Sequence, residues 1–374
     1  MRISFKNNKV RRAGRHVGKA LVLLLKQWLG LSTPPVILAY RGHGTLSEVF
    51  LSGHVLDDRL LYEPATTDST WSNIRAMLSR FASTSIPDAD VRIQAFGQEY
   101  VAKTDKNGFF YCHIILEKMP TPGWHQAKYS VSNPLDEGPD ELIASSDVLL
   151  VDGRKVRFGV ISDVDDTIII SYANRLFRKL RLVLTKNAHT RLPFPGVAEF
   201  YQALQQQHEQ TELPNPIFYV SSSEWNLYDF LLDFCQNQGI PKGIFFLQEL
   251  KQNLAQVFRS GGGTHNHKLD KVRRILRLFP SLPFILIGDS GQRDAELYAR
   301  LVEEFPERIE AIYLRQVDGG KRREEIMHLY QAVEYDHDKI CLTAKTGDAA
   351  EHAFQKGLIE KSGLDQVHAA VADA

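Results

Sequence analysis

Three carboxylates stand close together where a short apolar run ends. The stretch Phe158–Ile170 reads FGVISDVDDTIII, so Asp163, Asp165 and Asp166 are followed directly by Thr167. Side chains two apart in an extended segment point to the same face, so Asp163 and Asp165 can share one pocket. One carboxylate can then attack phosphorus while the other protonates the leaving oxygen, with Mg²⁺ offsetting their repulsion. The alternative is a turn with acidic caps.

Further polar residues follow other predicted strands. Ser221 comes after FYV, Lys268 stands at the start of a predicted helix, and Asp289 and Asp294 lie in GDSGQRD. Each of these alone is more typical of an ordinary strand end, helix start or acidic turn than of a site. Ligands bind at the carboxyl ends of strands in open α/β sheets. The ordered set therefore predicts one site that binds a phosphate and a metal ion.

This ordered set resembles the haloacid dehalogenase superfamily of phosphatases. The resemblance implies that Asp163 is the nucleophile and that Asp165 is the general acid and base. It implies that the substrate phosphate is held by Thr167, Ser221, Ser222 and Lys268. It also implies that Mg²⁺ is bound by Asp163, by the backbone carbonyl of Asp165, by Asp289 and by Asp294. Lys271 is a second candidate for the lysine role, and an acid at position 165 favours a phosphatase.

A narrower resemblance covers roughly Lys155–Tyr330. The motifs ISDVDDTI, FYVSSSEWNLYDFL, the HK pair before a helix and GDSGQRDAELY resemble the catalytic domain of the actin-patch-associated phosphatidate phosphatases, distant relatives of the lipins. Glu224 stands where many relatives have Pro, which is a loop difference. The family implies Mg²⁺-dependent hydrolysis of phosphatidate to diacylglycerol and phosphate.

Two other functions stay open from the sequence. The same chemistry can act on a soluble phosphate ester, such as a nucleotide or a sugar phosphate. A protein of another class, a non-catalytic lipid-binding or adaptor protein, can carry a phosphatase-like domain as a binding module only. The acid at Asp165 and the metal-binding acids argue against this last alternative.

The pattern of apolar residues changes near residue 153. Over 36–152, short alternating runs separated by turn residues predict a small antiparallel β-sandwich, Ig-like or transthyretin-like, with one helix over 70–81. Over 153–343, strands alternate with helices, which predicts an α/β domain with a Rossmann-like doubly wound parallel sheet. The resemblance implies a haloacid dehalogenase-like fold with a minimal cap. Residues 344–374 are expected to form a C-terminal tail of helical fragments or disorder, with no assigned role.

Composition restricts the partners. Lys and Arg total 45, as do Asp and Glu, so no global basic field indicates a nucleic-acid partner. The three cysteines, Cys112, Cys235 and Cys341, show neither a disulfide framework nor metal-ligand spacing. This is typical of a reducing compartment and predicts a cytoplasmic location.

Two basic segments indicate peripheral membrane contact. Residues 1–26 hold eight Lys or Arg within a basic amphipathic N-terminal segment, 1–35. Its apolar part, Ala20–Leu31, is too short to span a bilayer. Tyr172–Arg191 carries six basic residues and no acid, with apolar residues at helical spacing. Both segments can lie on an anionic membrane that presents the substrate, or they can be helices with a solvated basic face.

Overall fold

The computed structural model describes residues 35–57, 84–131, 142–164, 195–206, 213–248, 263–316 and 320–373 of the 374-residue chain. The chain divides into two compact units. One comprises most of the residues up to Val148, and the other comprises 149–374 with two short segments, His43–Ser47 and Thr121–Gly123. The predicted helix over 70–81 and both basic segments, 1–35 and Tyr172–Arg191, lie outside the described residues.

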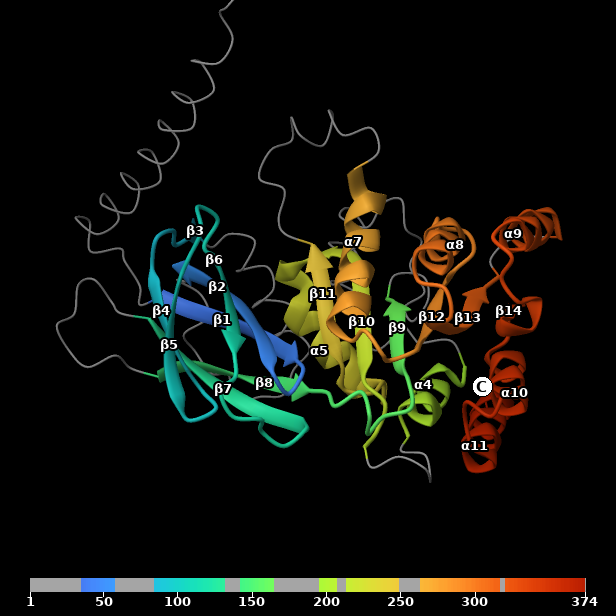
Figure 1. Cartoon of the computed structure of the whole chain (residues 1–374), viewed down its shortest axis with the longest axis horizontal. Coiled ribbons are helices and arrows are strands. Elements are labelled where there is room, and N and C mark those ends of the chain that lie inside the picture. The colour runs from blue at the N-terminus through green and yellow to red at the C-terminus, as the bar shows by residue number, and fades with distance from the viewer. Residues whose placement is uncertain are drawn as a thin grey trace, which may run out of the picture. The chain divides into compact units, whose positions relative to one another are not determined.

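The first unit is built on sheet A. Its strands are β1 (Pro35–Gly44), β2 (Glu48–Asp57), β3 (Thr84–Ser85), β4 (Asp90–Ala95), β5 (Gln98–Lys103), β6 (Phe109–Ile115), β7 (Gly123–Val131) and β8 (Leu142–Leu150). Strands pair in the order β3-β2-β1-β8-β7-β4-β5, and β6 pairs with β2 (Figure 1). Alternate residues of β4 are buried, as a sheet with one covered face requires. The inward set includes Val49, Val91 and Ile93, none of which is exposed.

Sheet A curls until its ends meet. Because β6 pairs with β2 and also contacts β5, the strands run almost completely round a ring. A sheet closed in this way has few free edges, which removes unpaired backbone groups from solvent. The result is one mixed, nearly barrel-shaped sheet.

The second unit is built on sheet B. Its strands, β9 (Gly159–Asp163), β10 (Ile217–Glu224), β11 (Ile244–Gln248), β12 (Phe284–Asp289), β13 (Ile309–Arg315) and β14 (Ile340–Thr343), pair in the order β11-β10-β9-β12-β13-β14. Every neighbouring pair is parallel. All residues of β9 and β12 are buried, because helices cover the sheet. Such strands are expected to be continuous apolar runs.

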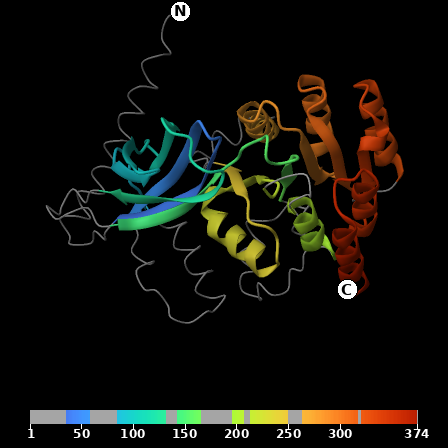
Figure 2. The ribbon, with the colours of Figure 1, turned by 60° about the horizontal axis from the view of Figure 1, so that its bottom comes forward.

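The helices of the second unit include α4 (Val197–Gln205), α5 (Tyr228–Asn237), α7 (Gly263–Leu278), α8 (Asp294–Glu304), α9 (Gly320–Ala332), α10 (Thr346–Gln355) and α11 (Lys361–Ala372). The short 3₁₀ turns are Trp225–Leu227 and His337–Lys339. Helix α7 packs on β10, α8 on β12 and β13, and α10 on β14. Figure 2 shows α11 beside α4, and the two helices are in contact.

The fold class predicted from the sequence is wrong. The first unit is not a sandwich of two facing antiparallel sheets, because sheet A is a single mixed sheet curled nearly into a barrel. Sheet B is all-parallel and separate from sheet A. The prediction that it belongs to a Rossmann-like, haloacid dehalogenase-like fold with a minimal cap is not supported. Alternation of apolar and polar residues indicates which faces are buried, but it does not indicate which strands pair.

The C-terminal segment differs from the expected tail. Residues 344–374 contain α10 and α11, whose buried residues include Ala350, Ala353 and Val367. Their small apolar side chains gave weak periodicity in the sequence, yet they allow close packing of α10, α11 and α4. In the described part of the chain, no helix is long and apolar enough to cross a membrane.

Candidate active site

Parallel pairing brings three polar strand ends together in sheet B. Asp163, the last residue of β9, is in register with Val220 of β10, so Ser221 follows at the same level. On the other side of β9, Ser162 is in register with Ile287 of β12, two residues before Asp289. The carboxyl ends of β9, β10 and β12 therefore form one edge (Figure 1). The strand order reverses at β9, which is where open parallel sheets bind ligands.

Lys268 joins two of the acids. Its Nζ lies 2.7 Å from Asp163 Oδ1 and also donates a hydrogen bond to Asp294 Oδ1. The side chains of Lys268, Asp163 and Asp294 are only 6%, 1% and 3% exposed. Burial lowers the pKa of Lys268, but the charges and hydrogen bonds of both carboxylates outweigh it and raise the pKa above its usual value. The side chain is therefore a fixed cation beside Asp163.

Asp294 is held by protein groups on both carboxylate oxygens. Oδ1 accepts from Lys268, and Oδ2 accepts from the backbone N–H of Asp289 at 3.1 Å. Gly288 makes this approach possible, because a Cβ there would lie 2.7 Å from Asp294 Oδ2. The structure thus places Asp294 as the partner of Lys268, and its role as a metal ligand stays a prediction.

Asp289 begins a tightly bonded loop. Its Oδ1 accepts from the N–H groups of Gly291 and Gln292, at 2.7 and 3.1 Å. Arg322, on α9, contacts both this loop and the first turn of α8. Its Nε donates to Ser290 O at 3.0 Å, and its Nη2 donates to Glu296 Oε1 of α8 at 2.8 Å. Sequence reasoning missed Arg322, since a basic residue in a KRREE helix looks like any solvated one.

The serines in the second half of β10 differ in exposure. Ser221 is fully buried, its Oγ accepts from the N–H of Ser223 at 2.8 Å, and its carbonyl accepts from Lys271 Nζ at 2.9 Å. Ser222 is exposed. Lys271, the second candidate for the lysine role, is thus a backbone partner of β10, whereas Lys268 contacts Asp163 itself.

A hydrogen-bonded chain supports Asp163 from behind. The Tyr201 hydroxyl, on α4, lies 2.6 Å from Ser162 Oγ, which donates to the Asp163 carbonyl at 2.6 Å. Burial raises the pKa of Tyr201, so this hydroxyl stays neutral. On the other strand, Tyr298 donates to the Ile287 carbonyl at 2.8 Å. No feature of the sequence distinguished these tyrosines from core aromatics.

Part of the predicted site lies outside the described residues. Asp165 and Thr167 fall in this part, so the general acid, one phosphate ligand and one metal carbonyl stay predictions. Among the residues that are described, no three His, Cys, Asp or Glu form a group suited to a metal ion. Asp163 and Asp289 nevertheless bring two buried carboxylates to adjacent strand ends. Carboxylate oxygen is the donor that Mg²⁺ prefers, so this donor set fits Mg²⁺.

Sequence comparison places this site in a class of phosphatase catalytic domains. Residues 158–316 match the family described as "Phosphatidate phosphatase APP1, catalytic domain". The prediction of the phosphatidate phosphatase family is thereby confirmed, while the wider haloacid dehalogenase superfamily receives no support. The matched segment contains Asp163, Ser221, Lys268, Asp289 and Asp294.

Two curated proteins are similar to this chain. Phosphatidate phosphatase APP1 of Saccharomyces cerevisiae is 32% identical over 180 residues, which is 46% of this chain and 28% of the yeast protein. The uncharacterized protein C29B5.04c of Schizosaccharomyces pombe is 26% identical over 227 residues, which is 59% of this chain and 35% of that protein. The chain thus spans about a third of the length of these relatives or less.

The solved structures that match this chain are only weakly similar to it. A carbohydrate acetylesterase from Xanthomonas citri matches with a TM-score of 0.26 and 13% identity, covering 81% of this chain and 74% of its own. A Porphyromonas gingivalis protein of unknown function matches with a TM-score of 0.17 and 7% identity, covering 36% and 60%. Scores this low establish no common fold.

Proposed function

We propose that this protein is a Mg²⁺-dependent phosphatidate phosphatase that works through an aspartyl-phosphate. The observation that carries the proposal is the buried Lys268 ammonium 2.7 Å from Asp163 Oδ1, at the carboxyl end of β9. A lysine in this position neutralises a phosphoryl oxygen while the carboxylate attacks. The match of residues 158–316 to the phosphatidate phosphatase family supports the lipid substrate.

In the proposed reaction, an Asp163 carboxylate oxygen forms a bond to phosphorus as the bond between phosphorus and the alcohol oxygen breaks. Asp165 gives its proton to the leaving alkoxide, so the alcohol departs neutral. Asp165 then takes a proton from a water molecule, which attacks phosphorus and releases phosphate from Asp163. Lys268 stays charged throughout and meets the charge that spreads over the phosphoryl oxygens.

Asp163, the Asp165 carbonyl and Asp289 are proposed to hold Mg²⁺, with Asp294 close by. When bound, the ion supplies positive charge that offsets the charge of the phosphoryl group and of the carboxylates. Asp294 positions Lys268 in this scheme, and Ser221 is proposed to bind a phosphate oxygen.

The test is phosphate release from phosphatidate in mixed micelles, with Mg²⁺ and then with excess chelator, beside a panel of soluble phosphomonoesters. We expect chelator-sensitive turnover that favours the lipid and is abolished in Asp163→Asn. Asp270→Asn is the matched control, because Asp270 is an exposed carboxylate on α7. Normal turnover by Asp163→Asn would reject the nucleophile. Turnover confined to soluble esters would keep the chemistry and reject the lipid.

We also propose a cytoplasmic location with peripheral membrane contact through Tyr172–Arg191 and the basic N-terminal segment. The support is their charge in the sequence. Flotation with anionic vesicles tests the contact. Recovery of the full-length protein only in the unbound fraction at low salt would reject it.

A further inference from the structure

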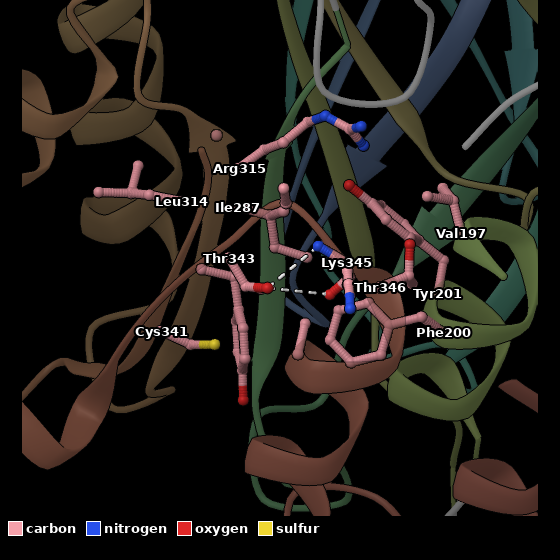
Figure 3. A pocket seen from close by; sticks show the side chains of 14 residues that line it. Val197, Phe200, Tyr201, Ile287, Leu314, Arg315, Cys341, Thr343, Lys345 and Thr346 are labelled. Atoms are coloured by element: carbon pink, nitrogen blue, oxygen red, sulfur yellow. Dashed lines mark hydrogen bonds between the residues drawn. The ribbon is translucent and has the colours of Figure 1, made fainter. Parts of the chain in front are cut away.

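A pocket opens beside the candidate active site in the second unit. It lies at the carboxyl ends of β12, β13 and β14, between the first turns of α4 and of α10, and Figure 3 shows its lining. Its volume is about 440 Å³, open solvent at the mouth included.

The walls of the pocket are mostly apolar. Aliphatic and aromatic side chains form them: Val197, Phe200, Tyr201, Ile287, Tyr313 and Leu314. The charged residues that line the pocket are two cations, Arg315 and Lys345, and none of the lining residues is Asn, Gln, Asp or Glu. A sugar or polyol that enters would exchange most of its hydrogen bonds to water for the few hydroxyl groups and two cations of this lining. An alkyl group that enters gives up no hydrogen bond, and its burial is favourable.

The pocket lies next to the catalytic cluster, because Gly288, which lines it, directly precedes Asp289. Tyr201 lines it and, through Ser162, supports the backbone of Asp163. Arg315 is in register with Asp289 on the neighbouring strand and extends across one rim of the pocket in Figure 3. Burial lowers the pKa of Arg315 to about 10, while the charge of Asp289 acts in the opposite direction, so the side chain stays cationic near neutral pH. The anionic end of a substrate is thus drawn to the side where Asp289 lies.

Residues outside the family match build one wall. Cys341, Thr343, Lys345, Thr346 and Ala349 come from β14, from α10 and from the turn between them. Thr343 Oγ1 lies 2.8 Å from Asp348 Oδ2 and accepts from the N–H of Lys345 at 3.0 Å. These bonds fix the turn, so this wall is ordered before any ligand arrives.

We propose that this pocket is the subsite for the apolar part of the alcohol in the phosphoester substrate, an alkyl or acyl chain attached near the phosphorylated oxygen. The subsite rests on the proposed phosphatase function. It deepens that function, because it selects phosphoesters of apolar alcohols over those of sugars.

The first experiment measures kcat/KM for n-alkyl phosphates from ethyl to octyl, below the concentrations at which they aggregate, with the full chain and Mg²⁺. Each methylene buried against the apolar wall is worth about 0.8 kcal/mol, or about fourfold in kcat/KM. We expect that rise over the first carbons and a plateau once the chain reaches solvent. A flat series with measurable phosphate release overturns the subsite and leaves the phosphatase function standing.

The second experiment fills the pocket. Ala349→Phe adds a ring at a buried wall position, and we expect the dependence on chain length to flatten to less than about twofold per methylene. This slope compares substrates in one sample, so any loss of folded protein cancels. Glu351→Phe, on the same helix but away from the lining, should keep the wild-type slope. An unchanged slope in Ala349→Phe overturns the subsite.

The third experiment needs no turnover. Cys341 lines the pocket, so octylphosphonate, whose carbon–phosphorus bond is not hydrolysed, should slow its alkylation by N-ethylmaleimide about tenfold at ten times its Kd. Mass spectrometry of the Cys341 peptide measures the rate, and Cys112 of sheet A should react as before. Protection in a chain that releases no phosphate supports the subsite while the proposed function fails. Unchanged alkylation of Cys341 overturns the subsite whatever the activity.

Discussion

Replacing Lys268 with Met removes the cation from between two buried carboxylates. Met keeps the apolar part of the side chain, so the change removes chiefly the ammonium group. Asp163 and Asp294 remain 1% and 3% exposed, with no ammonium between them. Breaking a buried ion pair by removing one partner costs about 3–5 kcal/mol, because the remaining charge stays buried. We expect a loss of this size in the second unit.

Hydrogen exchange measured by mass spectrometry suits this test, because it reports the opening of β9 and β12 separately from sheet A. A loss of about 3–5 kcal/mol lowers amide protection roughly 10²- to 10⁴-fold. The measurement is made with chelator present, so that no divalent cation replaces the missing charge. Lys271→Met is the matched control on the same helix, since it removes a bond to a neutral carbonyl, worth about 1 kcal/mol.

A second substitution tests whether the loss of stability comes from the two buried carboxylates. In Lys268→Met with Asp294→Asn, only one of the two carboxylates that Lys268 contacted is left, so at least half of the lost protection should return. A loss below about 1 kcal/mol in Lys268→Met would refute the reasoning, because the three side chains would then be solvated rather than buried. The same holds if the second substitution makes the protein less stable still.

Three further predictions concern the surroundings of the site. Gly288→Ala should lower kcat about 10²-fold, because the new Cβ displaces Asp294 and with it Lys268. Gly347→Ala is the control and should keep the normal kcat, because the atom nearest to its new Cβ would be 3.6 Å away. A normal kcat in Gly288→Ala would contradict the prediction. Arg322→Leu should weaken Mn²⁺ binding at least about tenfold by titration, because the loop that carries Asp289 loses its clamp, while Arg323→Leu on the same helix should bind normally. Burial and the nearby Arg274 lower the pKa of His43 to about 3, so below about pH 6.5 the unfolded chain binds a proton that the folded chain excludes. The free energy of unfolding, measured with urea, should thus fall by up to about 2.7 kcal/mol between pH 6.5 and 4.5. His43→Gln should remove this loss, whereas His328→Gln, at an exposed position, should keep it.

The sequence predicted the positions of the acids in sheet B better than their surroundings. Asp163 and Asp289 were placed at strand ends because each follows an apolar run, and parallel strands bring such ends to one edge. Lys268 was predicted at a helix start, but α7 begins at Gly263, so Lys268 lies in the second turn. Its bonds to two acids depend on how α7 packs, which no local pattern encodes. Arg322 and Tyr201 were missed because their partners, backbone carbonyls, Glu296 and Ser162, are far away in the chain.

Sheet A was mispredicted for a related reason. The residues of β6 alternate as the strands of a sandwich do, and nothing local shows that this strand contacts β5 while pairing with β2. The small side chains of α10 and α11, such as Ala350 and Ala353, likewise gave little periodic signal. Pairing and close packing are long-range properties, whereas periodicity is local.

The position of β9 in sheet B has a consequence for synthesis. Asp163 leaves the ribosome early, but the strand that flanks it on one side, β12, follows more than a hundred residues later. At about 5–20 residues per second, roughly 6–25 s pass before Ile287 can pair with Ser162. Until then one edge of an apolar strand is unpaired in the nascent chain, which exposes it to aggregation. This chain is therefore expected to depend on chaperones during translation, and its candidate active site forms only after α8 has emerged.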